Sequence, residues 1–219
     1  MPTANDVAGV IIARNGTWLD AMSLQKLLYY VQAWHVAITD EPLFSEQIKA
    51  WKDGPVVPQV WHARRDRASR RAAAQDIENI HLDDLASNLV DMVVHTYGSM
   101  SGEELSALTH AETPWIQARG DLPVDAECRN PINLDLMARF YRSHRKLGGR
   151  TAADLAAGGI HIRATEVVRR VDVDELLDSL GDEGMDAGDD PWGGGNLQDS
   201  SRLDAEGIEH ESRRSYADR

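Results

Sequence analysis

Residues 22–58 constrain the fold more than any other stretch of the chain. Between Leu24 and Ile38 the only charged side chain is Lys26, and apolar or weakly polar side chains recur at steps of three and four residues: Leu24, Leu27, Leu28, Val31, Trp34, His35 and Ile38. This spacing predicts an amphipathic helix over about residues 21–39. Ser23 precedes the first apolar residue and is expected to cap the helix. Because so little charge interrupts it, we expect this helix to be central and covered on much of its circumference.

Apolar residues with the same helical spacing, followed by residues that end helices, predict further helices around it, over residues 3–15, 82–98, 102–109 and 134–147. Residues 44–52 alternate loosely between the two faces of a chain, which predicts a short strand. Asp53 and Gly54 are expected to turn the chain, with Pro55 opening a new helix. The sequence therefore predicts a mainly α, compact helical domain with a small β element.

The composition excludes several classes of protein. The chain has 219 residues, 42% of them hydrophobic, which is enough for a substantial core. Its single cysteine, Cys128, excludes an internal disulfide and a cysteine-based zinc site. No segment approaches the roughly 20 apolar residues that span a bilayer, and the first residues lack the features of a signal peptide. We expect a cytoplasmic protein that has no membrane partner.

Charge is distributed unevenly along the chain. Residues 172–219 contain 15 acidic and 4 basic side chains, a net charge of −11 out of −13 for the whole chain. Nucleic acid is therefore an unlikely partner for the whole molecule, because phosphate binding requires an excess of lysine and arginine. Electrostatic steering would instead favour a partner with a basic surface.

The same shift in composition predicts three parts. Residues 1–149 form the main domain, residues 150–180 are too few for a core of their own and should dock onto the domain or a partner, and residues 181–219 form an acidic flexible tail. In this tail Trp192 is one of very few large apolar side chains. So little apolar surface cannot offset the entropy of ordering, so we expect the tail to be disordered in isolation.

Residues 62–71 are the one basic cluster, with five arginines against one aspartate. A nucleic-acid contact is one interpretation, and autoregulation of transcription would follow from it. A solvated helix end is the favoured interpretation, because no interleaved aromatic residues accompany the arginines.

The candidates for chemistry are few. No nucleotide-binding loop, dinucleotide fingerprint or nucleophile elbow is present. His110 and Glu112 could share a proton or a metal if they converge at a helix end, but side chains two apart on a helix diverge, and hydrogen bonding of Thr109 and His110 to backbone carbonyls is the favoured interpretation. We expect no enzyme activity, cofactor or metal.

Two further positions in the central helix allow alternatives. A catalytic Lys26 would need burial and a charged neighbour, whereas a lysine with a buried stem and an ammonium group in water is the favoured interpretation. Tyr29 and Tyr30 are adjacent, so their side chains diverge by about 100°. We expect one of them at most in the central core, and the other to reach a surface site.

Three separated motifs resemble one family. They are Met22–Trp34 (MSLQKLLYYVQAW), Ala50–Val56 (AWKDGPV) and Leu105–Arg119 (LSALTHAETPWIQAR). Together they resemble the Panacea domain, the SocA-like family often labelled phage-associated protein, over about residues 5–146. Ala33 stands where many members have a glycine, a change that a helix tolerates.

The resemblance implies a mostly helical antitoxin without catalytic activity, which neutralises a cognate toxin by direct binding. It implies diverse toxins, including nucleotide-transferring enzymes related to stringent-response synthetases. It also implies a second possibility, because one member is an adaptor that delivers its toxin to a protease. Residues 150–219 lie outside the resemblance and are candidates for the toxin-specific part.

Residues of the shared motifs, with one of the tail, are the expected partner contacts. We predict contacts by the following side chains and turn positions: Lys26, Tyr30, Trp51, Asp53, Gly54, Pro55, His110, Glu112, Trp115 and Trp192. Alternatives to neutralisation by binding are a proteolytic adaptor, which would require a protease or unfoldase as partner, and a metal-dependent enzyme using His110 and Glu112.

Overall fold

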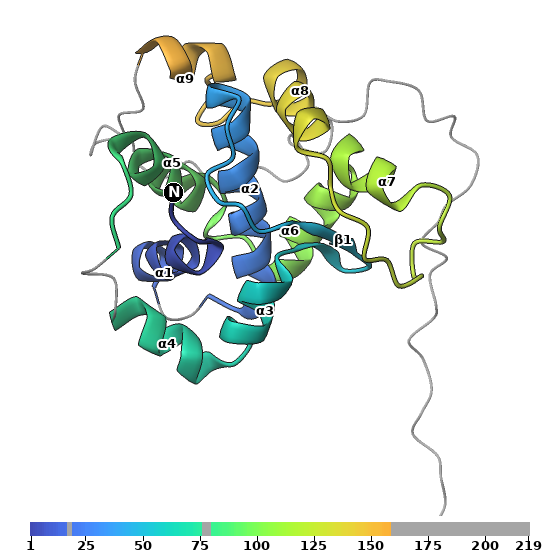
Figure 1. The fold of residues 1–219 in the computed structure, drawn as a ribbon, viewed down its shortest axis with the longest axis horizontal. Coiled ribbons are helices and arrows are strands. Elements are labelled where there is room, and N and C mark those ends of the chain that lie inside the picture. The colour runs from blue at the N-terminus through green and yellow to red at the C-terminus, as the bar shows by residue number, and fades with distance from the viewer. Residues whose placement is uncertain (17–18, 76–79, 159–219) are drawn as a thin grey trace, which may run out of the picture. The chain divides into compact units, whose positions relative to one another are not determined.

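The structure is a computed structural model that describes residues 1–16, 19–75 and 80–158 (Figure 1). In this part of the chain, helices and one two-stranded sheet follow in the order α1 (Ala4–Asn15), α2 (Ala21–Thr39), β1 (Lys49–Trp51), β2 (Gly54–Val56), α3 (Pro58–Arg64), α4 (Arg67–Gln75), α5 (Asp84–Tyr97), α6 (Gly102–His110), α7 (Thr113–Arg119), α8 (Leu134–His144) and α9 (Ala152–Gly158). The predicted fold class, mainly α with a small β element, is confirmed.

Helix α2 is the centre of the fold. It runs between α1, α5, α6, α8 and α9, and every residue from Ser23 to Ala37 is buried (Figure 1). The predicted bounds of this helix are confirmed. The predicted cap is wrong, since Asp20 is the capping residue and its carboxylate accepts from the backbone N–H of Ser23 at 2.8 Å. The negative charge of this carboxylate also interacts favourably with the positive end of the helix dipole.

The other helices follow local signals closely. Thr3 and Asp6 form a capping box at α1, and Ser101 and Glu104 form the predicted one at α6. Asn133 caps α8 as predicted, although this helix ends at His144, three residues earlier than expected. Reciprocal side-chain bonds of this kind satisfy the free N–H groups of a first turn, and the sequence alone reveals them.

The region around the sheet differs from the prediction. Strands β1 and β2 form a tight antiparallel hairpin in which Lys49 pairs with Val56 and Trp51 with Gly54. The strand is thus only three residues long, and Pro55 lies in β2 instead of opening a helix; α3 begins at Pro58. Proline has no N–H for a ladder bond, so it is tolerated where a short strand has no further strand beside it.

The core is continuous from α1 to α9. Ala152 and Leu155 of α9 are buried in it, and α9 packs against both α2 and α8. The boundary at residue 149 stays a prediction, and residues 159–180 and 181–219 lie outside the described residues. Within the described residues no helix is long and apolar enough to cross a membrane.

Candidate functional site

Lys26 lies beneath the β1–β2 hairpin and has only 1% of its surface exposed. Its Nζ donates to the backbone oxygen of Asp53 and lies 3.5 Å from that of Pro55. The expectation that the ammonium group lies in water is therefore wrong, because the hairpin covers the side chain to its tip. Burial lowers the pKa of Lys26 to about 7, and nearby Asp53 and Asp20 oppose this change.

Gly54 allows the hairpin to approach Lys26 closely. Its φ angle of 102° lies in the region that favours glycine, and a Cβ there would lie 2.5 Å from both Cε and Nζ of Lys26. A glycine at this turn therefore serves both the backbone conformation and the contact with the lysine.

Residues 105–119 hold the hairpin from its other side. Ser106 Oγ donates to the Asp53 oxygen at 2.9 Å, and Trp115 Nε1 donates to the Trp51 oxygen at 3.1 Å. Arg119 donates to the Ala50 oxygen at 3.3 Å. Helices α2, α6 and α7 therefore fix the backbone carbonyls of one short hairpin, and the three motifs of the sequence meet there.

His110 is part of this support. Its ring stacks on Trp115, with centroids 4.1 Å apart and planes 15° apart, and Nε2 lies 3.4 Å from Ser106 Oγ. Burial, with the positive charges of Lys26 and Arg119, lowers the pKa of His110 to about 4. The ring is thus neutral at pH 7. Thr109, in contrast, bonds the backbone oxygens of Leu105 and Ser106 as the favoured interpretation expected.

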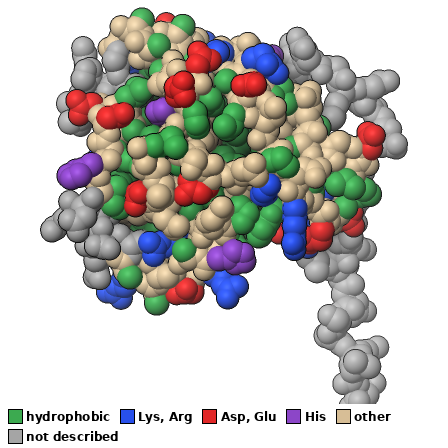
Figure 2. All heavy atoms as spheres, viewed as in Figure 1, with side chains coloured by type: hydrophobic (Ala, Val, Ile, Leu, Met, Phe, Trp, Pro, Cys, Tyr) green, Lys and Arg blue, Asp and Glu red, His purple; other side chains and the backbone are tan. Residues whose placement is uncertain are grey.

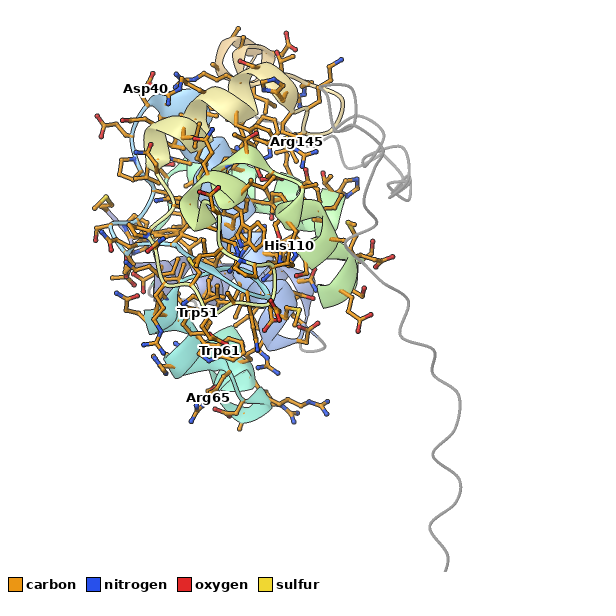
Figure 3. All side chains as sticks on the ribbon, turned by 90° about the vertical axis from the view of Figure 1, so that its right-hand side faces the viewer. Asp40, Trp51, Trp61, Arg65, His110 and Arg145 are labelled. Carbon is orange, nitrogen blue, oxygen red and sulfur yellow. The ribbon has the colours of Figure 1, made fainter. Side chains whose placement is uncertain are left out.

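Glu112 faces a different part of the core. It is fully buried and accepts from Tyr29 at 2.6 Å, from Tyr141 at 2.9 Å and from Arg145 at 2.5 Å. His110 and Arg145 are labelled well apart in Figure 3. His110 and Glu112 therefore face different parts of the structure, so a proton or metal shared between them is not supported. No group of side chains suited to a metal ion occurs among the described residues.

Tyr29 and Tyr30 are both fully buried, contrary to the expectation that one would reach the surface. Tyr29 bonds to Glu112, and Tyr30 stacks on Tyr97 of α5 at 4.2 Å between ring centroids. Burial raises the pKa of both hydroxyls well above the ordinary value, and the carboxylate of Glu112 adds to this. The expectation failed because helices cover α2 on opposite sides.

The exposed part of the hairpin forms a small pocket with α3. The volume of this pocket is about 220 Å³. We call the residues that line it the hairpin face: Met22, Gln25, Lys26, Trp51, Lys52, Asp53, Val56, Trp61 and Glu127. The rings of Trp51 and Trp61 meet edge to face at 6.0 Å (Figure 3). Exposed Lys52 and Glu127 form an ion pair at 3.3 Å on its rim.

The predicted contact residues fall into separate groups. Trp51 and Asp53 line the hairpin face, with Lys26 on its floor, and His110 is partly exposed nearby. The others in the described part of the chain are buried supports: Tyr30, Gly54, Pro55, Glu112 and Trp115. Trp192 lies outside the described residues. Sequence reasoning missed Trp61 and Met22, because only the packing of α3 and α2 against the hairpin brings them together.

Part of the chain is similar in sequence to known proteins. Residues 24–116 match the family described as "Antitoxin SocA-like, Panacea domain". A relative named "Antitoxin SocA", from Caulobacter vibrioides (strain NA1000 / CB15N), is 31% identical over 106 residues, covering 43% of this chain and 56% of the relative. The chain thus matches just over half the length of that relative. No solved structure matches the chain significantly. The similarity to the SocA-like Panacea domain therefore covers residues 24–116, which is less than half of the chain.

Proposed function

We propose that this protein neutralises a cognate toxin by binding it directly, with the hairpin face as the contact. One observation carries the proposal: the three motifs of the family all converge on a single hairpin whose tip is exposed. Lys26, Ser106 and Trp115 each bond to a backbone oxygen of that hairpin. A loop held in this way loses little entropy on binding, which favours affinity.

The side chains at the hairpin face suit a protein contact. Trp51 and Trp61 are partly exposed, and Lys52 and Asp53 are exposed beside them. Tryptophan residues at the centre of an interface contribute strongly when the partner desolvates them, and charged residues at the rim contribute mainly to orientation and association rate. The arrangement therefore fits a partner with an apolar anchor and a polar surround.

Residues 150–219 are the proposed toxin-specific part. The net charge of −11 in residues 172–219 fits a toxin with a basic surface, which a wrapping segment could cover. A nucleotide-transferring toxin is one class that fits, since substrates with phosphates require basic surfaces. We also propose a cytoplasmic location, where such a toxin would act.

Co-expression with the toxin from the neighbouring gene tests the contact. We expect Trp51→Ala combined with Trp61→Ala to weaken binding by more than about 30-fold, the effect of one hot-spot residue, and to abolish rescue of growth. Leu122→Ala is the matched control, because this side chain is exposed but lies outside the hairpin face. Calorimetry on purified proteins gives the affinity, and circular dichroism checks the fold. Full rescue by the folded double variant would exclude this contact.

A proteolytic adaptor is the second candidate, favoured by the acidic, glycine-containing composition of residues 181–219. Such a composition is typical of segments that unfoldases engage. The half-life of the toxin separates the two functions: an adaptor shortens it, whereas sequestration leaves it unchanged or longer.

A further inference from the structure

Two of the five arginines in the basic cluster hold the corner between α3 and α4. Arg70 Nη1 donates to the backbone oxygen of Arg64 at 2.9 Å and to that of Arg65 at 2.7 Å. Arg64 Nη1 donates to the backbone oxygen of Ser69 at 3.4 Å. Asp66, the one acidic residue of the cluster, accepts from the backbone N–H and the hydroxyl of Ser69, both at 2.9 Å. The corner is therefore fixed by its own side chains.

The other arginines of this corner carry positive charge to the surface. Arg65, Arg67 and Arg71 are exposed, as is His62, one helical turn before Arg65. Lys and Arg side chains are visible along the lower edge of Figure 2, where Figure 1 places α3 and α4. Five arginines against one aspartate give residues 62–71 a net charge of +4, although the whole chain has −13. A local positive surface therefore exists on a chain that is acidic as a whole.

Two indole rings border this positive surface. Trp61 and Arg65 are one helical turn apart, and Arg65 continues the helical backbone of α3, so both lie on the same side of it. The ring of Trp51 meets that of Trp61 edge to face at 6.0 Å, and both residues are partly exposed. Figure 3 labels Trp51, Trp61 and Arg65 in succession along this side. The sequence argued against a nucleic-acid contact because aromatic residues are not interleaved with the arginines, whereas the fold places two of them alongside.

Partly exposed indole rings beside exposed arginines are the combination that single-stranded nucleic acid requires. Guanidinium groups match the geometry of phosphates, and unpaired bases stack on aromatic rings whatever the base sequence. An acidic protein segment would pair with the arginines but would leave the indole rings unused. A duplex would leave them unused as well, because its bases are already stacked on one another. The surface therefore fits an unpaired strand better than either.

We propose that the α3–α4 corner binds single-stranded nucleic acid, with Arg65 and Arg71 on phosphates and a base stacked on the exposed part of Trp61. Because Trp51 and Trp61 already contact each other, the base lies on the outer side of the pair and not between the two rings. This activity goes beyond toxin neutralisation and does not rest on it. Trp61 also lines the hairpin face, so a toxin bound there and a strand on the corner exclude one another.

Fluorescence anisotropy of the full chain with labelled strands of about 15 nucleotides, near the upper site size of single-strand-binding domains, tests the proposal. Oligothymidylate and oligouridylate distinguish DNA from RNA, and binding of either supports the proposal. We expect a duplex of the same length to bind more weakly. Trp61→Ala should weaken strand binding by about 5- to 150-fold, the effect of losing one stacked base. Trp61→Phe retains an aromatic ring and should retain most of the affinity, and Leu122→Ala, at an exposed side chain elsewhere, should leave it unchanged.

Affinities measured over a range of salt concentrations test the phosphate contacts. Each phosphate that a single strand pairs with the protein contributes about −0.7 to the slope of log K against log salt concentration. Arg65→Gln and Arg71→Gln should each make the slope shallower by about that amount, whereas Arg139→Gln, at an exposed arginine of α8, should leave it unchanged. Arg71 lies outside the hairpin face, so Arg71→Gln should still neutralise the toxin, which separates a failure of this proposal from a failure of the proposed function.

Three results would overturn the proposal: no binding of either strand by the full chain, equal binding of the duplex, or strand binding that Trp61→Ala leaves unchanged. Polyglutamate that competes as effectively as an unlabelled strand would assign the corner to an acidic protein partner and would overturn it as well. Circular dichroism of each variant confirms that the fold is retained.

Discussion

At the scale of single residues, Glu112 and Arg145 form a buried ion pair within a group of tyrosines. Both side chains are almost completely buried, and Tyr29 and Tyr141 donate to the same carboxylate. Removing one partner of a buried pair leaves an uncompensated charge, which costs about 3–5 kcal/mol. We therefore expect Glu112→Gln to lower the free energy of unfolding by that amount in urea denaturation.

The exposed pair of Arg14 and Asp91, 2.7 Å apart, provides the control for that experiment. Exposed pairs contribute at most about 1 kcal/mol. Asp91→Asn should therefore have little effect. Equal decreases in the free energy of unfolding for the two variants would show that the buried pair is no more important for stability than the exposed one.

The lowered pKa of Lys26 predicts how the free energy of unfolding depends on pH. Its pKa in the folded protein is about 7, below the ordinary value of 10.5. Between these values the unfolded chain binds a proton that the folded protein has released. The free energy of unfolding should therefore rise with pH from about 7 to 10, by up to about 1.4 kcal/mol per unit, and should not change through this group below pH 7.

Lys26→Met should remove this slope in urea denaturation followed across pH, whereas Lys52→Met, at an exposed lysine, should retain it. Above pH 10 the raised pKa of the buried tyrosines reverses the trend, because the unfolded chain then loses protons that the folded protein keeps. An unchanged slope in the methionine variant would contradict the assignment to Lys26.

At the scale of elements, the β1–β2 hairpin depends on supports from three helices. Gly54→Ala adds a Cβ at a positive φ angle, 2.5 Å from the end of Lys26. Such a change costs more than about 1 kcal/mol, and it separates Lys26 from the Asp53 and Pro55 oxygens. We expect reduced stability, a higher pKa of Lys26 as it regains water, and weaker toxin binding.

Gly120→Ala is a suitable comparison for Gly54→Ala. Gly120 also has a positive φ angle, but a Cβ there would contact nothing. The backbone strain is thus common to both variants, and only the contact with Lys26 differs. Thermal unfolding and toxin affinity, measured side by side, separate the two contributions.

At the scale of the whole molecule, the core extends beyond the region that matches the family. Helix α9 buries Leu155 against α2 and α8. Loss of one buried leucine side chain alone costs about 2–5 kcal/mol. We therefore expect a chain ending at Gly149 to unfold at lower urea concentration than one ending at Gly158. Equal urea midpoints for the two chains would place the end of the stable domain at residue 149.

Much of the local structure follows from the sequence. The bounds of α2, the capping boxes of α1 and α6 and the Asn133 cap of α8 all depend on residues within a few positions of one another. The hairpin was predicted less well, because its strands are too short for a reliable alternation and bonds from distant helices determine its shape. The contact role of the predicted site residues stays a prediction.

The sequence by itself determined the helical class, the central position of α2 and the three motifs that resemble the SocA-like Panacea domain. Only the tertiary structure decided which of these residues are buried supports of the fold and which lie at the surface. Lys26, Tyr30 and Glu112 have no sequence feature that reveals full burial, because their partners Asp53, Tyr97 and Tyr29 lie 27 to 83 positions away in the chain. Packing against α5, α8 and the hairpin removes them from water, and it leaves Trp51 and Asp53 at the surface.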